Sequence, residues 1–87
     1  MKVQMEVSLY PFGVKEISPP IMAFVETLQK EGFETEVGPL SSYVTGESEA
    51  LFPALGRAFE QVAKKHRCVL VTKVVRWASP STPNNNQ

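Results

Sequence analysis

The stretch FETEVGPLSSYVTGE, residues 33–47, predicts a β-hairpin, and the fold of the chain is organised around it. Apolar and polar side chains alternate over residues 33–37 and again over residues 40–44, which is the period-2 pattern of strands. Gly38 and Pro39 interrupt the alternation, as turn residues do. The second strand is rich in hydroxyl groups, and a buried hydroxyl must find a hydrogen-bond partner. This strand is therefore a candidate for ligand binding as well as for packing.

A strand and a helix are expected before the hairpin. Residues 2–10 alternate between apolar and polar side chains, and residues 19–31 carry apolar side chains at helical spacing. Ser18 followed by Pro19 is typical of a helix cap and a first helical residue, and Gly32 is typical of the position after a helix end. The order up to the hairpin is therefore strand, helix, hairpin.

A second helix and a last strand are expected after the hairpin. Ser48 is the expected helix cap, and the helix begins there or nearer Ala50, because Pro53 removes a backbone hydrogen bond. Residues 68–77, CVLVTKVVRW, are apolar or β-branched on both faces, as in a strand that is covered on two sides. A second copy of the chain is the simplest cover for the face that the helices leave open.

The predicted order β-α-β-β-α-β indicates an α+β ferredoxin-like sandwich, with a four-stranded antiparallel sheet and two helices on one face. The first and third strands are expected to be parallel neighbours at the centre of this sheet. With 87 residues and 43% hydrophobic content, the chain can build one core. We expect a single domain over residues 1–77 and a disordered tail over residues 78–87, ASPSTPNNNQ.

Composition and charge exclude several classes of function. Nine basic residues balance nine acidic ones, so the chain has no overall field to attract nucleic acid. The absence of a signal peptide and of a long apolar run predicts a soluble, cytoplasmic protein with no membrane partner. Cys68 is expected to be a small buried apolar residue, and His66, without a second histidine, predicts neither a metal site nor a triad. We expect no metal, no cofactor and, without an acid–base pair beside a nucleophile, no enzymatic activity.

A polar cluster is expected on the open face of the sheet. If apolar residues such as Leu40 and Val44 face the helices, alternation brings together on the opposite face Glu6, Ser8, Tyr10, Ser41, Tyr43 and Thr45. Hydroxyls and a carboxylate can hydrogen-bond a ligand, and tyrosine rings form flat walls or attract a cation. Ser42 faces the helices and would serve if the ligand lay between sheet and helices, and Glu47 at the strand end could reach either face. Interface packing is the alternative use of the cluster.

Three segments resemble a known family. VSLYPFG (7–13), EVGPLSSYVTGE (36–47) and LFPALGRAFE (51–60) are similar to the thiamine- and hydroxymethylpyrimidine-binding domains of the thiamine-binding protein family. The resemblance covers residues 2–76. It implies a ferredoxin-like fold, an oligomeric or tandem-repeat arrangement, and binding of thiamine or its pyrimidine precursor without catalysis. For this chain we expect a homodimer or homotetramer. An aminopyrimidine needs donors, acceptors and an aromatic wall, and a thiazolium needs a π face or a carboxylate, which are the groups of the polar cluster.

Other functions of this fold require residues that the chain lacks. An RNA-recognition domain would carry a basic glycine-aromatic motif, which LSSYVTGE (40–47) does not contain. An acylphosphatase-like enzyme would, by resemblance, carry an arginine in the first loop, where the chain has PFGVKEIS (11–18). A metallochaperone would carry C-x-x-C, and the chain has one cysteine. A structural or regulatory oligomer without a thiamine ligand is the alternative that stays open.

Overall fold

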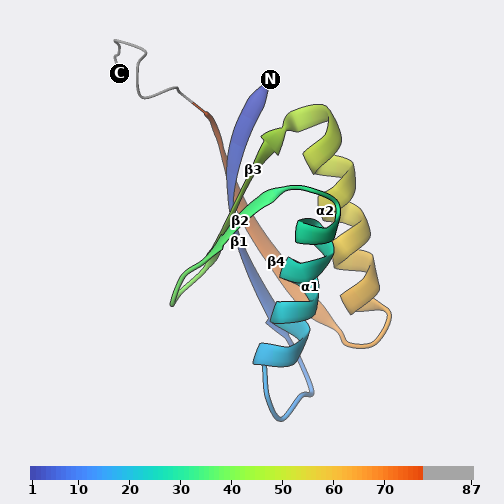
Figure 1. Ribbon diagram of the computed structural model, residues 1–87. Coiled ribbons are helices and arrows are strands. Elements are labelled where there is room, and N and C mark those ends of the chain that lie inside the picture. Colours follow the sequence, from blue (N-terminus) through green and yellow to red (C-terminus); the bar gives the residue numbers. More distant parts are fainter. Residues whose placement is uncertain (78–87) are drawn as a thin grey trace.

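The computed structural model describes residues 1–77, and the predicted disordered tail, residues 78–87, lies outside the described residues. The elements in chain order are β1 (Lys2–Pro11), α1 (Ser18–Lys30), β2 (Glu34–Val37), β3 (Ser42–Glu47), α2 (Ser48–Ala63) and β4 (Cys68–Arg76). This is the predicted β-α-β-β-α-β order, and both helices lie on one side of the sheet (Figure 1). No helix within residues 1–77 is long and apolar enough to cross a membrane.

The sheet has the strand order β2-β3-β1-β4, and every neighbouring pair is antiparallel. The predicted antiparallel ferredoxin-like sheet is therefore confirmed, but the prediction that its first and third strands are parallel is wrong. Helix α1 carries the chain back along the sheet, so β2 runs in the same direction as β1. The hairpin turn then reverses the direction of the chain. Strand β3 enters the sheet between β1 and β2 and runs antiparallel to both.

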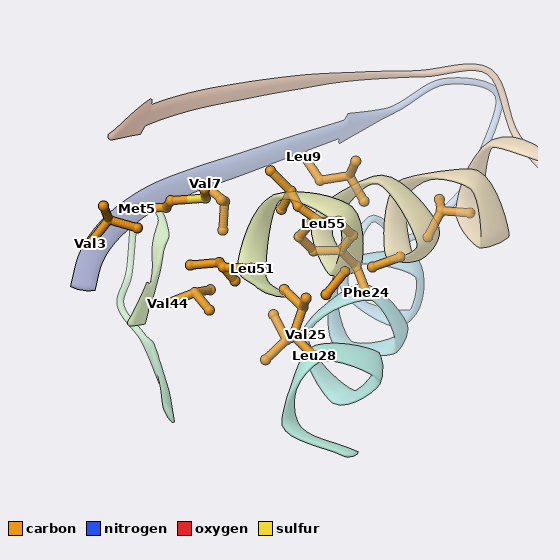
Figure 2. Close-up of a cluster of buried hydrophobic side chains, with 13 residues drawn as sticks. Val3, Met5, Val7, Leu9, Phe24, Val25, Leu28, Val44, Leu51 and Leu55 are labelled. Atoms are coloured by element: carbon orange, nitrogen blue, oxygen red, sulfur yellow. The ribbon is translucent and has the colours of Figure 1, made fainter. Parts of the chain in front are cut away.

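The core lies between the helices and the inner face of the sheet (Figure 2). Alternate residues of β1 and one apolar stripe of each helix are buried there, as the sequence periods predict. The buried apolar side chains include Val3, Met5, Val7, Leu9, Phe24, Leu28, Val44, Leu51 and Leu55.

Leu40 does not join this core, contrary to its expected place against the helices. It is 92% exposed, because β3 begins only at Ser42. The Gly38 N–H donates a 2.9 Å hydrogen bond to the carbonyl oxygen of Ser41, which closes a short turn over residues 38–41. The alternating pattern continues through this turn, but the strand does not.

The start of α1 differs from the prediction by one residue. Ile17, and not Ser18, is its N-cap, and no side-chain hydrogen bond caps the helix. Pro19 and Pro20 follow in the first turn and have no N–H for a capping hydroxyl to bind, so an apolar cap costs little. Gly32, with φ of 94°, takes the left-handed conformation after the helix end, as predicted.

Helix α2 begins at Ser48, with Glu47 and not the expected Ser48 as N-cap. Pro53 lies inside the helix. A proline beyond the first turn lacks the N–H that would bond to the carbonyl four residues earlier, that of Glu49, and its ring crowds that carbonyl. The helix therefore carries a local cost at Pro53.

We expect Pro53→Ala to raise the free energy of unfolding by about 1–2 kcal/mol, because alanine restores the N–H and has the highest helix propensity. Urea unfolding followed by circular dichroism measures the change. The matched control is Pro20→Ala in the first turn of α1, where proline is well tolerated and no gain is expected. An equal gain in both variants would contradict a helix-interior cost at Pro53.

Candidate functional site

The open face of the sheet, which points away from the helices, carries a hydrogen-bonded network around Glu6. Glu6 on β1 lies opposite Tyr43 on β3 and Lys73 on β4. The Ser41 and Tyr43 hydroxyls donate to its Oε2 at 3.0 Å and 3.4 Å, and the Lys73 Nζ lies 3.9 Å from its Oε1. Both oxygens of this carboxylate are therefore engaged by the protein itself.

Apolar side chains surround this network and are open to solvent in the single chain. Val69, Val71 and Val75 on β4 are 44%, 48% and 58% exposed. Tyr10 at one end of the sheet and Trp77 at the other are also partly exposed. The outer face of β4 has no cover within residues 1–77, although its composition is that of a strand covered on both faces.

Two shallow hollows lie on the open face. The larger has a volume of about 340 Å³ and is lined by Gln4, Glu34, Thr35, Glu36, Tyr43, Thr45 and Trp77. The smaller has a volume of about 220 Å³ and is lined by Gln4, Glu6, Tyr43, Lys73, Val74 and Val75. Charged side chains contribute to both hollows, so each suits a polar or charged group more than a neutral ring.

A third cavity, here called the hairpin pocket, lies where β1 extends beyond β3. The first residue of β3, Ser42, is paired with Val7, whereas β1 continues to Pro11 in pairing with β4. The space beside the unpaired side of β1 is closed by the hairpin turn and by the start of α1. It has a volume of about 190 Å³ and is lined by Val7, Ser8, Leu9, Tyr10, Ile17, Ile21, Val37, Gly38, Pro39, Leu40, Ser41 and Ser42.

The chemistry of the hairpin pocket is neutral. None of these lining residues is charged. Ile17 and Ile21 provide apolar walls, Ser41 and Ser42 provide hydroxyls, and Ser42 is only 5% exposed. Beyond Val7, the side of β1 that faces away from β4 has no strand neighbour within residues 1–77, so no strand pairs with the backbone polar groups there. Such a pocket suits a small uncharged heterocycle with donors and acceptors on its edge.

The seven predicted site residues fall into two groups and not into one cluster. The hairpin pocket contains Ser8, Tyr10, Ser41 and Ser42. The open-face hollows contain Glu6, Tyr43 and Thr45. The division arises because the sheet twists and ends unevenly, so residues that share one face by alternation lie at different ends of it.

Other residues take places that sequence reasoning did not assign. Ile17 and Ile21 line the hairpin pocket, but an apolar residue at a helix start looks in sequence like any other core residue. Glu47 lines none of these three cavities, because it lies 3.2 Å from the amino group of Met1. Its hydrogen bond raises the pKa of that amino group above its usual 8.0. An ion pair thus links the amino terminus of the chain, next to the start of β1, to the end of β3.

Comparison with known proteins gives one family and several similar structures. The sequence signature of a family described as thiamine-binding protein matches residues 5–78. No curated protein sequence matches the chain.

Three solved structures are similar to this one. A hypothetical protein of Methanocaldococcus jannascii has 22% identity and a TM-score of 0.80, over 92% of this chain and 84% of that chain. A Thermotoga maritima protein, provisionally assigned to thiamine biosynthesis or salvage, has 23% identity and a TM-score of 0.75, over 85% and 82%. A domain of unknown function from Bacillus cereus has 23% identity and a TM-score of 0.74, over 98% and 83%. At these identities the likeness shows a shared ferredoxin-like fold.

Proposed function

Because the chain belongs to the thiamine-binding protein family, we propose that it binds thiamine or the hydroxymethylpyrimidine part of thiamine without chemical change. The observation that carries this proposal is the hairpin pocket, an uncharged space lined by hydroxyls beside an unpaired strand edge. Its volume of about 190 Å³ is below the range of roughly 300–1,000 Å³ that is usual for drug-sized ligands. A single substituted ring fits this space better than a whole two-ring vitamin.

In this proposal the pyrimidine ring enters the pocket and the thiazolium remains at its mouth. The ring lies between the apolar walls of Ile17 and Ile21, and its edge meets the hydroxyls of Ser41 and Ser42 and the free backbone groups of β1. Tyr10 is 54% exposed at the mouth, where its ring can lie against the cationic thiazolium. The neutral pocket and the aromatic mouth therefore match the two halves of thiamine.

The pocket supports binding more than catalysis. No histidine lines the pocket, and the carboxylate that its Ser41 hydroxyl contacts, that of Glu6, also accepts a hydrogen bond from Tyr43 and lies outside the lining. Binding through hydroxyls, backbone and apolar walls needs neither a metal nor a cofactor. We accordingly propose a non-enzymatic, cytoplasmic carrier or sensor.

Self-association is a second part of the proposal. The exposed valines of β4, together with Tyr10 and Trp77, form an apolar surface that a second copy of the chain would cover. The product would be a homodimer or homotetramer, with no role for nucleic acid or membrane. A structural or regulatory oligomer without a thiamine ligand would use the same surface, so ligand binding is what separates the two functions.

Isothermal titration with thiamine and, separately, with hydroxymethylpyrimidine tests the ligand. We expect one saturable site per chain for each compound. Tyr10→Ala is expected to weaken thiamine binding about tenfold, because an aromatic wall over a cation contributes roughly 1–1.5 kcal/mol. Tyr43→Ala, the same change beside the open-face hollows, is expected to weaken binding less, by below about threefold, because Tyr43 reaches the pocket only through its hydrogen bond to Glu6.

The reverse order of the two tyrosine variants would place the ligand on the open face. No heat with either compound at about millimolar concentration, where binding free energy would be only about 4 kcal/mol, would favour the structural or regulatory oligomer.

A further inference from the structure

Glu6 is connected to the hairpin pocket without lining it. Ser41 lines the pocket, and its hydroxyl donates a 3.0 Å hydrogen bond to Oε2 of Glu6 on the open face. Glu6 itself borders the smaller open-face hollow. Ser41 is therefore the lining residue through which this carboxylate is hydrogen-bonded to the hairpin pocket.

The direction of this hydrogen bond decides what Ser41 offers a ligand. An ionised carboxylate only accepts hydrogen bonds, so the single proton of the Ser41 hydroxyl is committed to Glu6. The Ser41 oxygen then has only lone pairs to offer a ligand, and toward that ligand it acts as an acceptor. A ligand that needed a donor from Ser41 would have to break a charge-assisted hydrogen bond, which is stronger than a neutral one.

Glu6 is itself held in place by the side chains that donate hydrogen bonds to its carboxylate or pair with it. The Tyr43 hydroxyl donates to the same Oε2 at 3.4 Å, and the Lys73 Nζ lies 3.9 Å from Oε1. These groups come from two strands on either side of β1. The carboxylate is thus oriented before any ligand arrives, and so is the hydroxyl that it fixes.

We propose that Glu6 is a positioning residue that fixes Ser41 as a hydrogen-bond acceptor in the hairpin pocket. The pocket then selects ligands that present an N–H donor at this point, such as a ring amino group, over ligands that present a carbonyl. The identity of the selected ligand rests on the proposed function. The hydrogen bond from Ser41 to Glu6 exists without a ligand, so the positioning role is tested separately.

Amide hydrogen exchange of residues 38–42 in the ligand-free protein tests whether Glu6 fixes the position of Ser41. The reporter is the Gly38 amide, which donates to the Ser41 carbonyl oxygen at 2.9 Å. Glu6→Ala is expected to speed its exchange about fivefold, the effect of losing one hydrogen bond, and Ser41→Ala to do the same. The double variant is expected to be no faster than either single variant. The matched control is Glu36→Ala, which removes a carboxylate that lines only the larger open-face hollow and should not change the exchange.

Competition between thiamine and oxythiamine, in which a carbonyl replaces the ring amino group, tests the selection. The unchanged protein is expected to prefer thiamine by about tenfold or more, because oxythiamine would place two acceptors against each other. Glu6→Ala frees the Ser41 hydroxyl to donate and is expected to reduce the preference to below about threefold. Glu6→Gln, whose amide oxygen can still accept the Ser41 hydrogen bond, is expected to keep most of the preference for thiamine. Glu36→Ala is expected to keep the whole preference.

The two measurements separate the possible failures. Unchanged exchange in Glu6→Ala would overturn the positioning role, whatever binds. Faster exchange with an unchanged preference would overturn the selection by Ser41. If neither compound binds the unchanged protein while exchange responds as expected, the positioning role stands and the proposed thiamine function fails.

Discussion

Phe24→Ala is expected to lower the free energy of unfolding by about 3–5 kcal/mol, the usual cost of truncating a buried phenylalanine. Phe24 is 1% exposed in the middle of α1 and belongs to the buried cluster between the helices and the sheet (Figure 2). Removing its ring leaves a cavity between the layers, and the surrounding side chains, which belong to two helices and a sheet, relax only in part. A loss of about 4 kcal/mol corresponds to a fall in Tm of roughly 15–30 °C for a domain of this size.

The matched control for this prediction is Phe52→Ala. Phe52 is a phenylalanine of α2 that is 50% exposed, and its truncation is expected to cost less than about 1 kcal/mol. Chemical and thermal unfolding of both variants measure the difference. Similar costs for the two changes would mean that the core does not lie between the helices and the sheet.

Val71→Lys is expected to dissociate the proposed oligomer. Val71 lies on the open face, opposite Ser8, and is 48% exposed in the single chain. In an interface between two copies, each copy would bury a new ammonium group without a partner, at a cost of several kcal/mol. The dissociation constant is therefore expected to rise at least about 100-fold, which sedimentation velocity at micromolar concentration detects as a shift to monomer.

Val74→Lys is the control on the same strand. Val74 lies opposite the buried residue Met5, and thus on the helix side of the sheet, and is 42% exposed. The same change at a similar exposure is expected to leave the assembly intact. If Val71→Lys and Val74→Lys behave alike, or if the unchanged protein is already a monomer, association through the open face is wrong.

Much of the fold was predictable because burial imposes regular periods on the chain. The alternation of β1 and the helical spacing of α1 and α2 correctly indicate which side chains are buried. The relative direction of β1 and β3 was not predictable from these periods, because alternation contains no information on direction. Only the path of the chain through α1 and the hairpin makes the two strands antiparallel.

The candidate site was less predictable than the fold for a related reason. Alternation assigns Glu6, Ser8 and Ser41 to one face, but it does not say where along the sheet a neighbouring strand stops. The turn at residues 38–41 delays the start of β3 to Ser42, so Ser41 reaches the hairpin pocket while Glu6 remains on the open face. Turn closure depends on backbone geometry that the hydrophobic pattern does not encode, and the exposed position of Leu40 has the same origin.

The late start of β3 also determines how a ligand would enter and leave. The hairpin pocket occupies a place where strand pairing is missing, at the rim of the sheet, and the core between the layers does not have to separate to reach it. One of its walls is the turn over residues 38–41, and surface loops rearrange within nanoseconds to microseconds. Ligand exchange can therefore proceed on the time scale of a loop, without waiting for the much slower unfolding of the domain. A protein built in this way would release the proposed ligand and stay folded.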